Sequence, residues 1–242
     1  MPDFSQRSQQ KELLDRDDIP FDDIRRNMQE LEIINKFLGG HSITLAGIKH
    51  VLRGAAFWGP LSICEIGCGG GDNLKAIYRW AKFRKIEIKV IGIDINADCI
   101  TYARENCSMI KDAEWIVSDY RNVNFKNTPL IIFSSLFSHH FTNHELIAQL
   151  QWMKRNSSFF FINDLHRHPL AYHSIKLLTR FFSKSYLVKN DAPLSVLRGF
   201  SRSEWKELLN NAGIEKFELK WKWAFRWLVI VRREVRIVNR ET

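Results

Sequence analysis

The sequence predicts an α/β fold with a mostly parallel sheet that helices cover on both faces. Short apolar runs alternate with amphipathic helical stretches between residues 61 and 162, a rhythm typical of βαβ units. The first apolar run ends in a glycine-rich turn that opens a helix, residues 67–71. Two apolar runs near the C-terminus, 214–223 and 227–231, indicate an antiparallel hairpin at the sheet edge.

Each element has its own local signal. Residues 1–20 are polar and predict a mobile arm. Apolar residues at helical spacing predict helices over 22–38, which Gly39-Gly40 ends, and over 42–52. The predicted strands that follow are 61–66, 86–93, 113–117, 129–134 and 158–162, separated by helices at 72–83, 97–107 and 144–153. A helix over 170–183, a loop to Arg198 and a helix over 203–211 with Ser203 as N-cap then precede the hairpin.

Composition suits one globular domain. The chain has 242 residues, of which 45% are hydrophobic and 26% charged, which excludes wholesale disorder. Only 12 Gly and 4 Cys are present, which excludes collagen-like and disulfide-scaffold classes. Because the cysteines show no paired or metal-ligand spacing, we expect a reducing, cytoplasmic location. The longest apolar run, near 227–231, is too short to span a bilayer.

The net charge of +9 suits nucleic acid, an anionic membrane surface or an anionic ligand as partner, and does not choose among them. The positive excess lies in residues 151–200, which carry eight bases and two acids. A solvated face is the plain alternative explanation of this stretch.

The glycine-rich turn is the sharpest local feature. It follows Glu65 and runs Gly67-Cys68-Gly69-Gly70-Gly71-Asp72. A dinucleotide fingerprint would need a glycine where Asp72 stands, and a Walker loop would need Lys-Ser/Thr. Glycines let the backbone approach a ligand closely, and the following helix N-terminus favours a carboxylate or phosphate.

Acidic residues follow the next two strands. Asp94 ends the second strand, where a carboxylate can accept both hydroxyls of a ribose. After the third strand, Asp119 can accept from an exocyclic amine and Tyr120 can pack on a purine ring. Together with the glycine turn, these residues predict a pocket for a nucleoside with a small zwitterionic tail. Helix capping is the alternative role for both acids, and it does not exclude ligand contact.

At these residues the segment 61–230 resembles class I S-adenosylmethionine-dependent methyltransferases. Residues 64–71, 92–96 and 118–120 are similar to the family's first three motifs. Residues 130–141 and 159–167 resemble small-molecule methyltransferases of ubiquinone, menaquinone, polyketide and phenolic-lipid pathways. The resemblance implies a Rossmann-like seven-stranded sheet with strand 7 antiparallel. It also implies an N-terminal arm and helical cap over 1–60 and a catalytic domain over 61–242, with a helical lid at about 165–200.

The resemblance implies S-adenosylmethionine as cofactor and assigns roles within its site. Glu65 would face the methionine end, Asp94 the ribose, and Asp119 with Tyr120 the adenine. The full predicted cofactor set is Glu65, Gly67, Gly69, Gly71, Asn73, Asp94, Ile95, Asp119, Tyr120 and Ser135.

Histidines follow the fourth and fifth strands, on the side where reactants bind in such sheets. A hydroxyl acceptor needs a base, and an imidazole near its ordinary pKa suits a phenol proton. We predict His140 or His139 as this base, with His166 next; packing or capping is the alternative role. Asp164 could orient a histidine, bind the acceptor or cap the next helix, and the predicted acceptor site is Asp164, Arg167 and Tyr172.

No metal site is predicted, because adjacent histidines should point in different directions and no HxxxH with a companion acid is present. Residues 134–137, Ser-Ser-Leu-Phe, depart from the Asp/Asn-Pro-Pro-aromatic motif of amino-methylating nucleic-acid enzymes, so no nucleic-acid partner is expected.

The expected function is O-methylation of a small hydrophobic acceptor with a phenolic, polyketide-derived or quinone-precursor hydroxyl. The alternatives are C-methylation of such a ring, an RNA or protein methyltransferase, a binding module without turnover, or a sulfonium-assisted decarboxylation or cyclisation. The basic lid leaves contact with a membrane surface open, without stable insertion.

Overall fold

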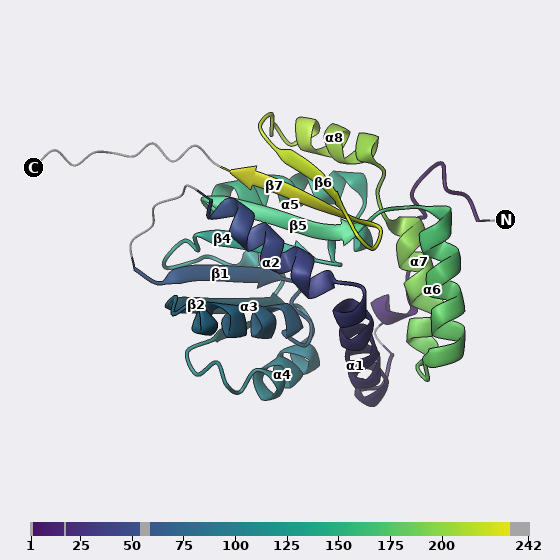
Figure 1. Ribbon diagram of the computed structural model, residues 1–242, viewed down its shortest axis with the longest axis horizontal. Helices are drawn as coiled ribbons and strands as arrows, with labels where there is room; N and C mark the ends of the chain where they lie inside the picture. The colour runs from purple at the N-terminus through teal and green to yellow at the C-terminus, as the bar shows by residue number, and fades with distance from the viewer. Residues whose placement is uncertain (1, 17, 54–58, 233–242) are drawn as a thin grey trace, which may run out of the picture.

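The structure is a computed structural model that describes residues 2–16, 18–53 and 59–232. Its centre is a seven-stranded sheet in the order β3-β2-β1-β4-β5-β7-β6 (Figure 1). The strands are β1 (Leu61–Ile66), β2 (Ile88–Asp94), β3 (Glu114–Val117), β4 (Ile131–Ser135), β5 (Phe159–Leu165), β6 (Glu218–Lys222) and β7 (Arg226–Arg232). Strands β1 to β5 pair in parallel with one another. β7 pairs antiparallel with both β5 and β6. The predicted Rossmann-like class with an antiparallel strand 7 is confirmed.

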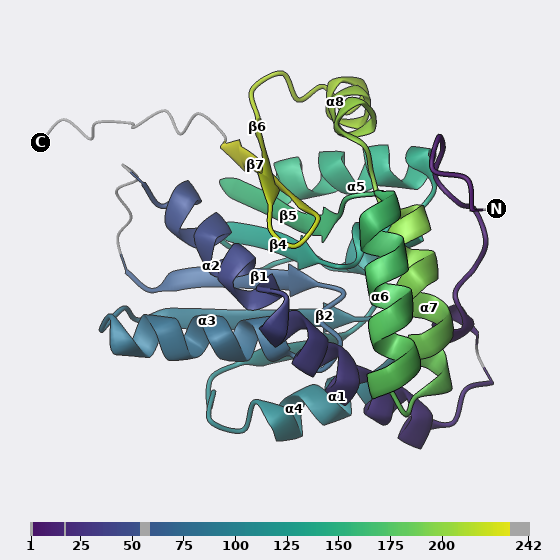
Figure 2. The ribbon, with the colours of Figure 1, turned by 45° about the vertical axis from the view of Figure 1, so that its right-hand side comes forward.

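Helices lie on both faces of this sheet and beyond the carboxyl ends of its parallel strands (Figures 1 and 2). They are α1 (Phe21–Phe37), α2 (Gly40–Val51), α3 (Asp72–Phe83), α4 (Ala97–Asn106), α5 (Asn143–Asn156), α6 (Pro169–Phe182), α7 (Tyr186–Arg198) and α8 (Arg202–Asn211). The apolar side chains of α2, α3 and α4 share one buried cluster with the sheet, and those of α5 and α8 share a second one. The sheet therefore has a hydrophobic core on each side, as a parallel sheet requires.

Close packing between α2 and the sheet depends on a glycine. A Cβ at Gly47 would lie 2.7 Å from the ring of Phe161. That ring stacks on Phe133 of the neighbouring strand, with centroids 4.9 Å apart. Gly47 therefore lets α2 lie directly on β5, which fixes the helix that leads into the first strand.

Strand register brings the predicted site residues to one edge. Glu65 pairs with Gly92 of β2, and Ser135 pairs with Asn163 of β5. The parallel strands point toward α1, α6 and α7, which lie beyond their carboxyl ends (Figures 1 and 2). Residues from both halves of the chain thus close over the edge where reactants bind in doubly wound sheets.

Two local predictions are wrong, and a third lies partly outside the described residues. The loop expected before Arg198 is helix α7, which contains Pro193, and a proline inside a helical pattern is ordinarily a break signal. Helix α8 is capped by Ser201 rather than Ser203: its hydroxyl accepts from the Glu204 N–H in a capping box. The predicted cap and catalytic domain include residues 54–58 and 233–242, which lie outside the described residues.

The polar N-terminal segment is seated on the protein rather than mobile. Arg7 is 8% exposed and Glu12 4% exposed. The Arg7 guanidinium donates to the carbonyls of Arg198, His139 and Phe141. The prediction of a mobile arm was wrong because a polar pattern alone indicates a solvated segment, whereas the charged side chains here are buried and paired. Residues 2–16 are called the N-terminal arm below.

Candidate functional site

A cavity of about 1250 Å³ lies at the edge where the parallel strands end. The glycine turn and the ends of β2 and β4 form one side, and the N-terminal arm, α1, α6 and α7 form the other. Among the predicted site residues, it is lined by Glu65, Gly67, Gly69, Asn73, Asp94, Ile95, Ser135, His139 and His140. The remaining predicted residues are not among those that line it: Gly71, Asp119, Tyr120, Asp164, His166, Arg167 and Tyr172.

The glycine turn presents backbone to the cavity. Gly67, Gly69 and Gly71 have φ of 65°, 48° and 76°, which side chains rarely adopt. A Cβ at Gly67 would lie 2.2 Å from the ring of Phe137, so that position has no room for one. The Gly69 N–H donates to Asp94 Oδ2 at 2.9 Å, which ties the turn to the end of β2.

Glu65 is a buried carboxylate with one oxygen free. Asn73 Nδ2 donates to Glu65 Oε1 at 2.9 Å. The other oxygen, Oε2, accepts no hydrogen bond from any residue that the structure describes. Burial raises the pKa of Glu65 well above its usual range. A buried, under-satisfied carboxylate beside a cavity fits a cationic ligand group, such as the ammonium of a methionine tail.

Asp94 stands at the next strand end and holds the loop around it. Its Oδ1 accepts from the Asn96 N–H at 3.0 Å, and its Oδ2 accepts from Gly69. Burial raises the pKa of Asp94, and these backbone hydrogen bonds partly oppose the rise. The N-cap of α4 is Asn96, so Asp94 is not the helix cap. Each carboxylate oxygen retains a second lone pair, which fits a pair of ribose hydroxyls.

Ile95 and Ser135 complete this end of the cavity. The Ile95 side chain is 73% exposed, which is unusual for a large apolar group and suits contact with a flat ring. Ser135 ends β4, and its hydroxyl accepts from Asn163 Nδ2 at 3.3 Å.

Three predicted cofactor residues have other roles here. Asp119 caps a short 3₁₀ helix and pairs with Arg121 at 2.5 Å. Tyr120 is 5% exposed and packs edge-on against Trp152 and two phenylalanines of the core. Gly71 faces α4, where a Cβ would lie 2.8 Å from Cys107 Sγ. These three residues do not line the cavity, so it does not support the expected adenine contact of Asp119 and Tyr120 or the expected cofactor contact of Gly71.

His139 is a buried histidine between two carboxylates. It lies in the 3₁₀ helix Ser138–His140. Its Nδ1 is 2.8 Å from Asp164 Oδ1, and its Nε2 is 3.5 Å from Glu12 Oε1. Burial would lower the pKa of His139, but Asp164 and Glu12 outweigh it and raise that pKa to about 9. The same pairing holds the pKa of Asp164 below its usual range despite burial. Of the three roles considered for Asp164, orienting a histidine fits these contacts.

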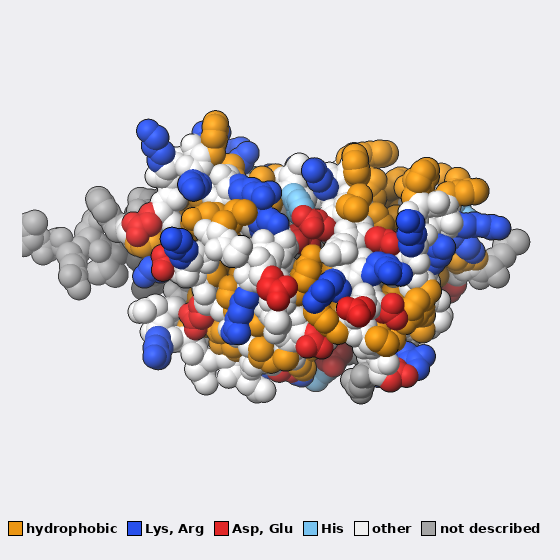
Figure 3. Space-filling view, turned by 90° about the horizontal axis from the view of Figure 1, so that it is seen from below, with side chains coloured by type: hydrophobic (Ala, Val, Ile, Leu, Met, Phe, Trp, Pro, Cys, Tyr) orange, Lys and Arg blue, Asp and Glu red, His pale blue; other side chains and the backbone are white. Residues whose placement is uncertain are grey.

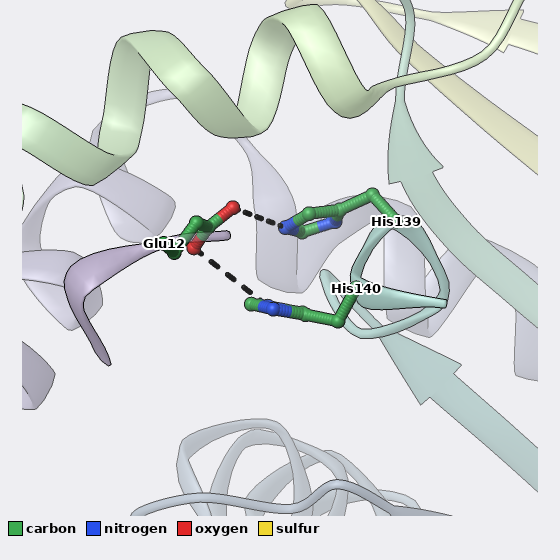
Figure 4. Close-up of side chains that lie close together, drawn as sticks. All are labelled: Glu12, His139 and His140. Carbon is green, nitrogen blue, oxygen red and sulfur yellow. Dashed lines mark ion pairs between the residues drawn. The ribbon is translucent and has the colours of Figure 1, made fainter. Parts of the chain in front are cut away.

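His140 lies beside His139 and faces the same carboxylate. The two ring centroids are 4.4 Å apart and the planes are tilted by 32°. His140 Nε2 is 3.9 Å from Glu12 Oε2 (Figure 4). Its Nδ1 is 3.1 Å from Asp15 Oδ1. The expectation that adjacent histidines diverge is wrong, because the tight 3₁₀ turn places both rings side by side. We refer to Glu12, His139 and His140 as the histidine–glutamate cluster.

The other three predicted catalytic or acceptor residues lie away from the cavity. His166 accepts a hydrogen bond at Nδ1 from Trp221 Nε1, and burial lowers its pKa. The Arg167 guanidinium is buried and pairs with Glu204 at 2.8 Å. Tyr172 packs edge-on against Phe4. His166 and Arg167 directly follow β5, which predicted them near the site, but their side chains point into structural contacts instead.

Sequence reasoning missed the contribution of the N-terminal arm. Glu12 and Asp15 reach the histidines from more than 120 residues away in sequence. Ser195 of α7 donates to Glu12 Oε1 at 2.7 Å, which holds that carboxylate in place. The only sequence signal is a pair of acids three residues apart in a polar stretch, which has no specificity without the fold.

The rest of the cavity wall is largely apolar. Its aliphatic and aromatic lining comes from α1, α6, α7 and the β6–β7 turn: Ile24, Met28, Leu31, Ile34, Leu38, Leu170, Ala171, Ile175, Leu178, Val196, Trp223 and Phe225. The outer side of α6 is apolar too, with Leu177, Phe181 and Phe182 at least 59% exposed. Figure 3 shows hydrophobic side chains gathered with Lys and Arg at the end of the molecule that α6 and α7 occupy. No helix among the described residues is long and apolar enough to cross a membrane.

Comparison with known proteins identifies the central part of the chain. Residues 63–157 match the family model described as a methyltransferase domain. This range includes the glycine turn, Asp94 and both histidines of the cluster. A search of curated protein sequences found no match.

Solved structures share the fold at low sequence identity. The plantazolicin methyltransferase BpumL in complex with SAH has a TM-score of 0.66 at 17% identity, over 86% of this chain and 90% of that chain. Human N-acetylserotonin methyltransferase in complex with SAM has a TM-score of 0.62 at 16% identity, over 89% of this chain and 57% of that chain. Magnesium protoporphyrin IX methyltransferase from Synechocystis with bound SAM has a TM-score of 0.53 at 10% identity, over 81% and 80%.

The family model therefore shows a methyltransferase domain over residues 63–157, in line with the predicted enzyme class, and the solved structures share the predicted fold. Two of those structures hold SAM, the cofactor that the sequence predicts for this chain. The solved structures include methyltransferases with different acceptors, so they do not identify the acceptor of this chain or show whether the methyl group goes to oxygen or carbon. The ubiquinone, menaquinone and polyketide branch stays a prediction.

Proposed function

We propose that this protein transfers the methyl group of S-adenosylmethionine to a hydroxyl of a small, mostly apolar acceptor. The observation that supports this proposal is that a single cavity is lined both by the predicted cofactor residues and by the histidine–glutamate cluster. Glu65, Gly67 and Asp94 line one end, and the histidine–glutamate cluster lines the other. A cofactor and an acceptor bound in the same cavity can meet without rearrangement of the sheet.

The cofactor supplies a methyl group already activated by the sulfonium charge. The protein's residues hold the two reactants in line and handle the proton of the acceptor hydroxyl. Glu65 would hold the ammonium and Asp94 the ribose, because these are the buried carboxylates that line the cavity next to the glycine turn. The hydroxyl would face the histidine–glutamate cluster, where His140 would receive its proton, while His139 stays protonated between Asp164 and Glu12.

The apolar wall supports an aromatic or prenyl-like acceptor body. Burial of a phenolic ring against leucine and isoleucine side chains contributes about 25 cal/mol per Å² of apolar surface. A phenolic, polyketide-derived or quinone-precursor hydroxyl combines such a body with one acidic proton, and we propose this class. The helical cap and the lid, residues 1–60 and 165–200, would close over it. The four cysteines are free and buried, which supports a cytoplasmic location.

A labelled-methyl transfer assay tests the proposal. The full chain would be incubated with methyl-labelled S-adenosylmethionine and a panel of hydroxylated aromatic acceptors, each paired with its deoxy analogue. We expect label in the hydroxylated members only. Label in the deoxy ring compounds would favour C-methylation, and label in RNA or protein alone would overturn the proposed acceptor class.

A further inference from the structure

The histidine–glutamate cluster has the donor atoms of a metal site. The Nε2 atoms of His139 and His140 lie 3.5 Å and 3.9 Å from the two carboxylate oxygens of Glu12. One ligand atom from each residue lies within 4.8 Å of the others. A first-row metal with bonds of about 2.0–2.2 Å needs its donors roughly 3 Å apart, so a small inward movement suffices.

The opposite nitrogen of each ring is held by a second carboxylate. Asp164 lies 2.8 Å from His139 Nδ1, and Asp15 lies 3.1 Å from His140 Nδ1. An acceptor at Nδ1 fixes the proton there and turns the Nε2 lone pair outward. Metal-binding histidines are oriented in the same way by an outer carboxylate or carbonyl. Both rings can therefore carry the proton at Nδ1 and direct the Nε2 lone pair toward Glu12, as metal coordination requires.

The charges around the cluster favour a cation. Three carboxylates, Glu12, Asp15 and Asp164, surround the two imidazoles, and Glu12 and Asp164 are at most 4% exposed. Arg198 opposes them in part, with Nε 3.9 Å from Glu12 Oε1, but its guanidinium donates to the carbonyls of His139 and His140. A divalent ion between the imidazoles would replace the protons that otherwise balance these carboxylates.

We propose that Glu12, His139 and His140 bind a divalent first-row transition metal ion, which holds an oxygen of the acceptor. Two imidazole nitrogens and one carboxylate suit zinc, iron, cobalt or nickel, whereas magnesium prefers oxygen ligands. Three protein ligands leave coordination positions for an oxygen from the cavity that the residues line. An imidazole lone pair that binds a metal ion cannot also accept the proton of the acceptor hydroxyl. A histidine of the cluster can therefore serve as metal ligand or as base, but not as both at once.

Only the acceptor part of this inference rests on the proposed function. Metal binding is measured with the full chain alone, by calorimetric titration with Zn²⁺ and by visible absorption with Co²⁺. We expect one ion per chain and a cobalt spectrum typical of nitrogen and oxygen ligands. Asp15→Asn should weaken binding about 10–100-fold, because Asp15 only orients His140. Glu12→Gln and His140→Ala should weaken it more than that.

His144→Ala is the matched control, since His144 is an exposed histidine on the first turn of α5 outside the cluster. It should bind Zn²⁺ like the wild type. Binding of S-adenosylhomocysteine should be equal in all variants, which shows that the cofactor half remains folded. The inference is overturned by the absence of a stoichiometric ion. Equal affinity in Glu12→Gln, His140→Ala and wild type also overturns it, as does a thiolate-to-cobalt band from Cys68, which also lines the cavity.

Discussion

The carboxylate of Asp164 in β5 lies 2.8 Å from Nδ1 of His139 in the 3₁₀ helix after β4, and both side chains are buried. Asp164 also accepts the backbone N–H of His139 at 3.2 Å. The pair therefore fixes the loop after β4 as well as the imidazole. It places Nε2 toward the N-terminal arm, where Glu12 completes the cluster.

Removal of the Asp164 charge should destabilise the protein. Asp164→Asn leaves His139 buried with one charged partner fewer, and breaking a buried ion pair costs about 3–5 kcal/mol. Urea denaturation followed by fluorescence measures the change. Glu145→Gln is a control, since Glu145 is the third residue of α5, accepts the backbone N–H of the N-cap Thr142 and is far less buried. If Asp164→Asn lowers the free energy of unfolding no more than Glu145→Gln does, the buried ion pair between Asp164 and His139 is contradicted.

The stability contributed by His139 should depend on pH. Its pKa is raised from 6.5 to about 9, so the folded protein binds this proton more tightly than the unfolded chain. The contribution is fully present below pH 6.5 and is lost as the pH rises through about 9. The free energy of unfolding should therefore differ most between wild type and His139→Gln below pH 6.5. A difference that stays constant from pH 6 to pH 10 would rule out the raised pKa.

Glu65→Gln should weaken cofactor binding without loss of stability. The neutral amide costs less to bury than a carboxylate with one unpaired oxygen, so the free energy of unfolding at pH 7 should not fall. The lost charge should weaken S-adenosylhomocysteine binding by at least about tenfold, the loss of one charge-assisted hydrogen bond. Calorimetry and urea denaturation measure the two effects. A variant that loses stability and keeps affinity would make Glu65 structural.

Gly67→Ala should remove cofactor binding. The added Cβ would meet the Phe137 ring at 2.2 Å in a backbone conformation that already disfavours side chains. Gly213→Ala is the matched control, because Gly213 also has a positive φ, 69°, but no atom within 4 Å of a new Cβ. The control should cost about 1–2 kcal/mol of backbone strain and keep the affinity for S-adenosylhomocysteine. Equal affinity in both variants would contradict the close approach of the turn.

Arg7→Ala should release the N-terminal arm. The guanidinium donates to three backbone carbonyls and to Asn143 Oδ1, and the arm carries Glu12. We expect faster chymotryptic cleavage within the arm and a lower kcat, with unchanged affinity for S-adenosylhomocysteine. Arg16→Ala is the control, since the ion pair of Arg16 that the structure describes is with nearby Asp18 on the surface. Equal cleavage rates in the two variants would contradict an arm held by Arg7.

Periodicity and glycine spacing were sufficient to predict the sheet, most of its helices and the place of Glu65, Gly67 and Asp94 at one cavity. The signals there are local: Glu65, Gly67 and Asp94 stand at strand ends that βα alternation already defines. The acceptor end depends on contacts that no local pattern contains. Glu12 reaches His139 from more than 120 residues away in sequence. Arg167 follows the strand that contains Asp164, yet its side chain pairs with Glu204.

The most direct test is a crystal structure of the full chain with S-adenosylhomocysteine. The ligand should place its ammonium at Glu65, its ribose at Asp94 and the open side of its sulfur toward His139 and His140. A ligand bound outside this cavity, or a sulfur that faces away from both histidines, would contradict the joined cofactor and acceptor site.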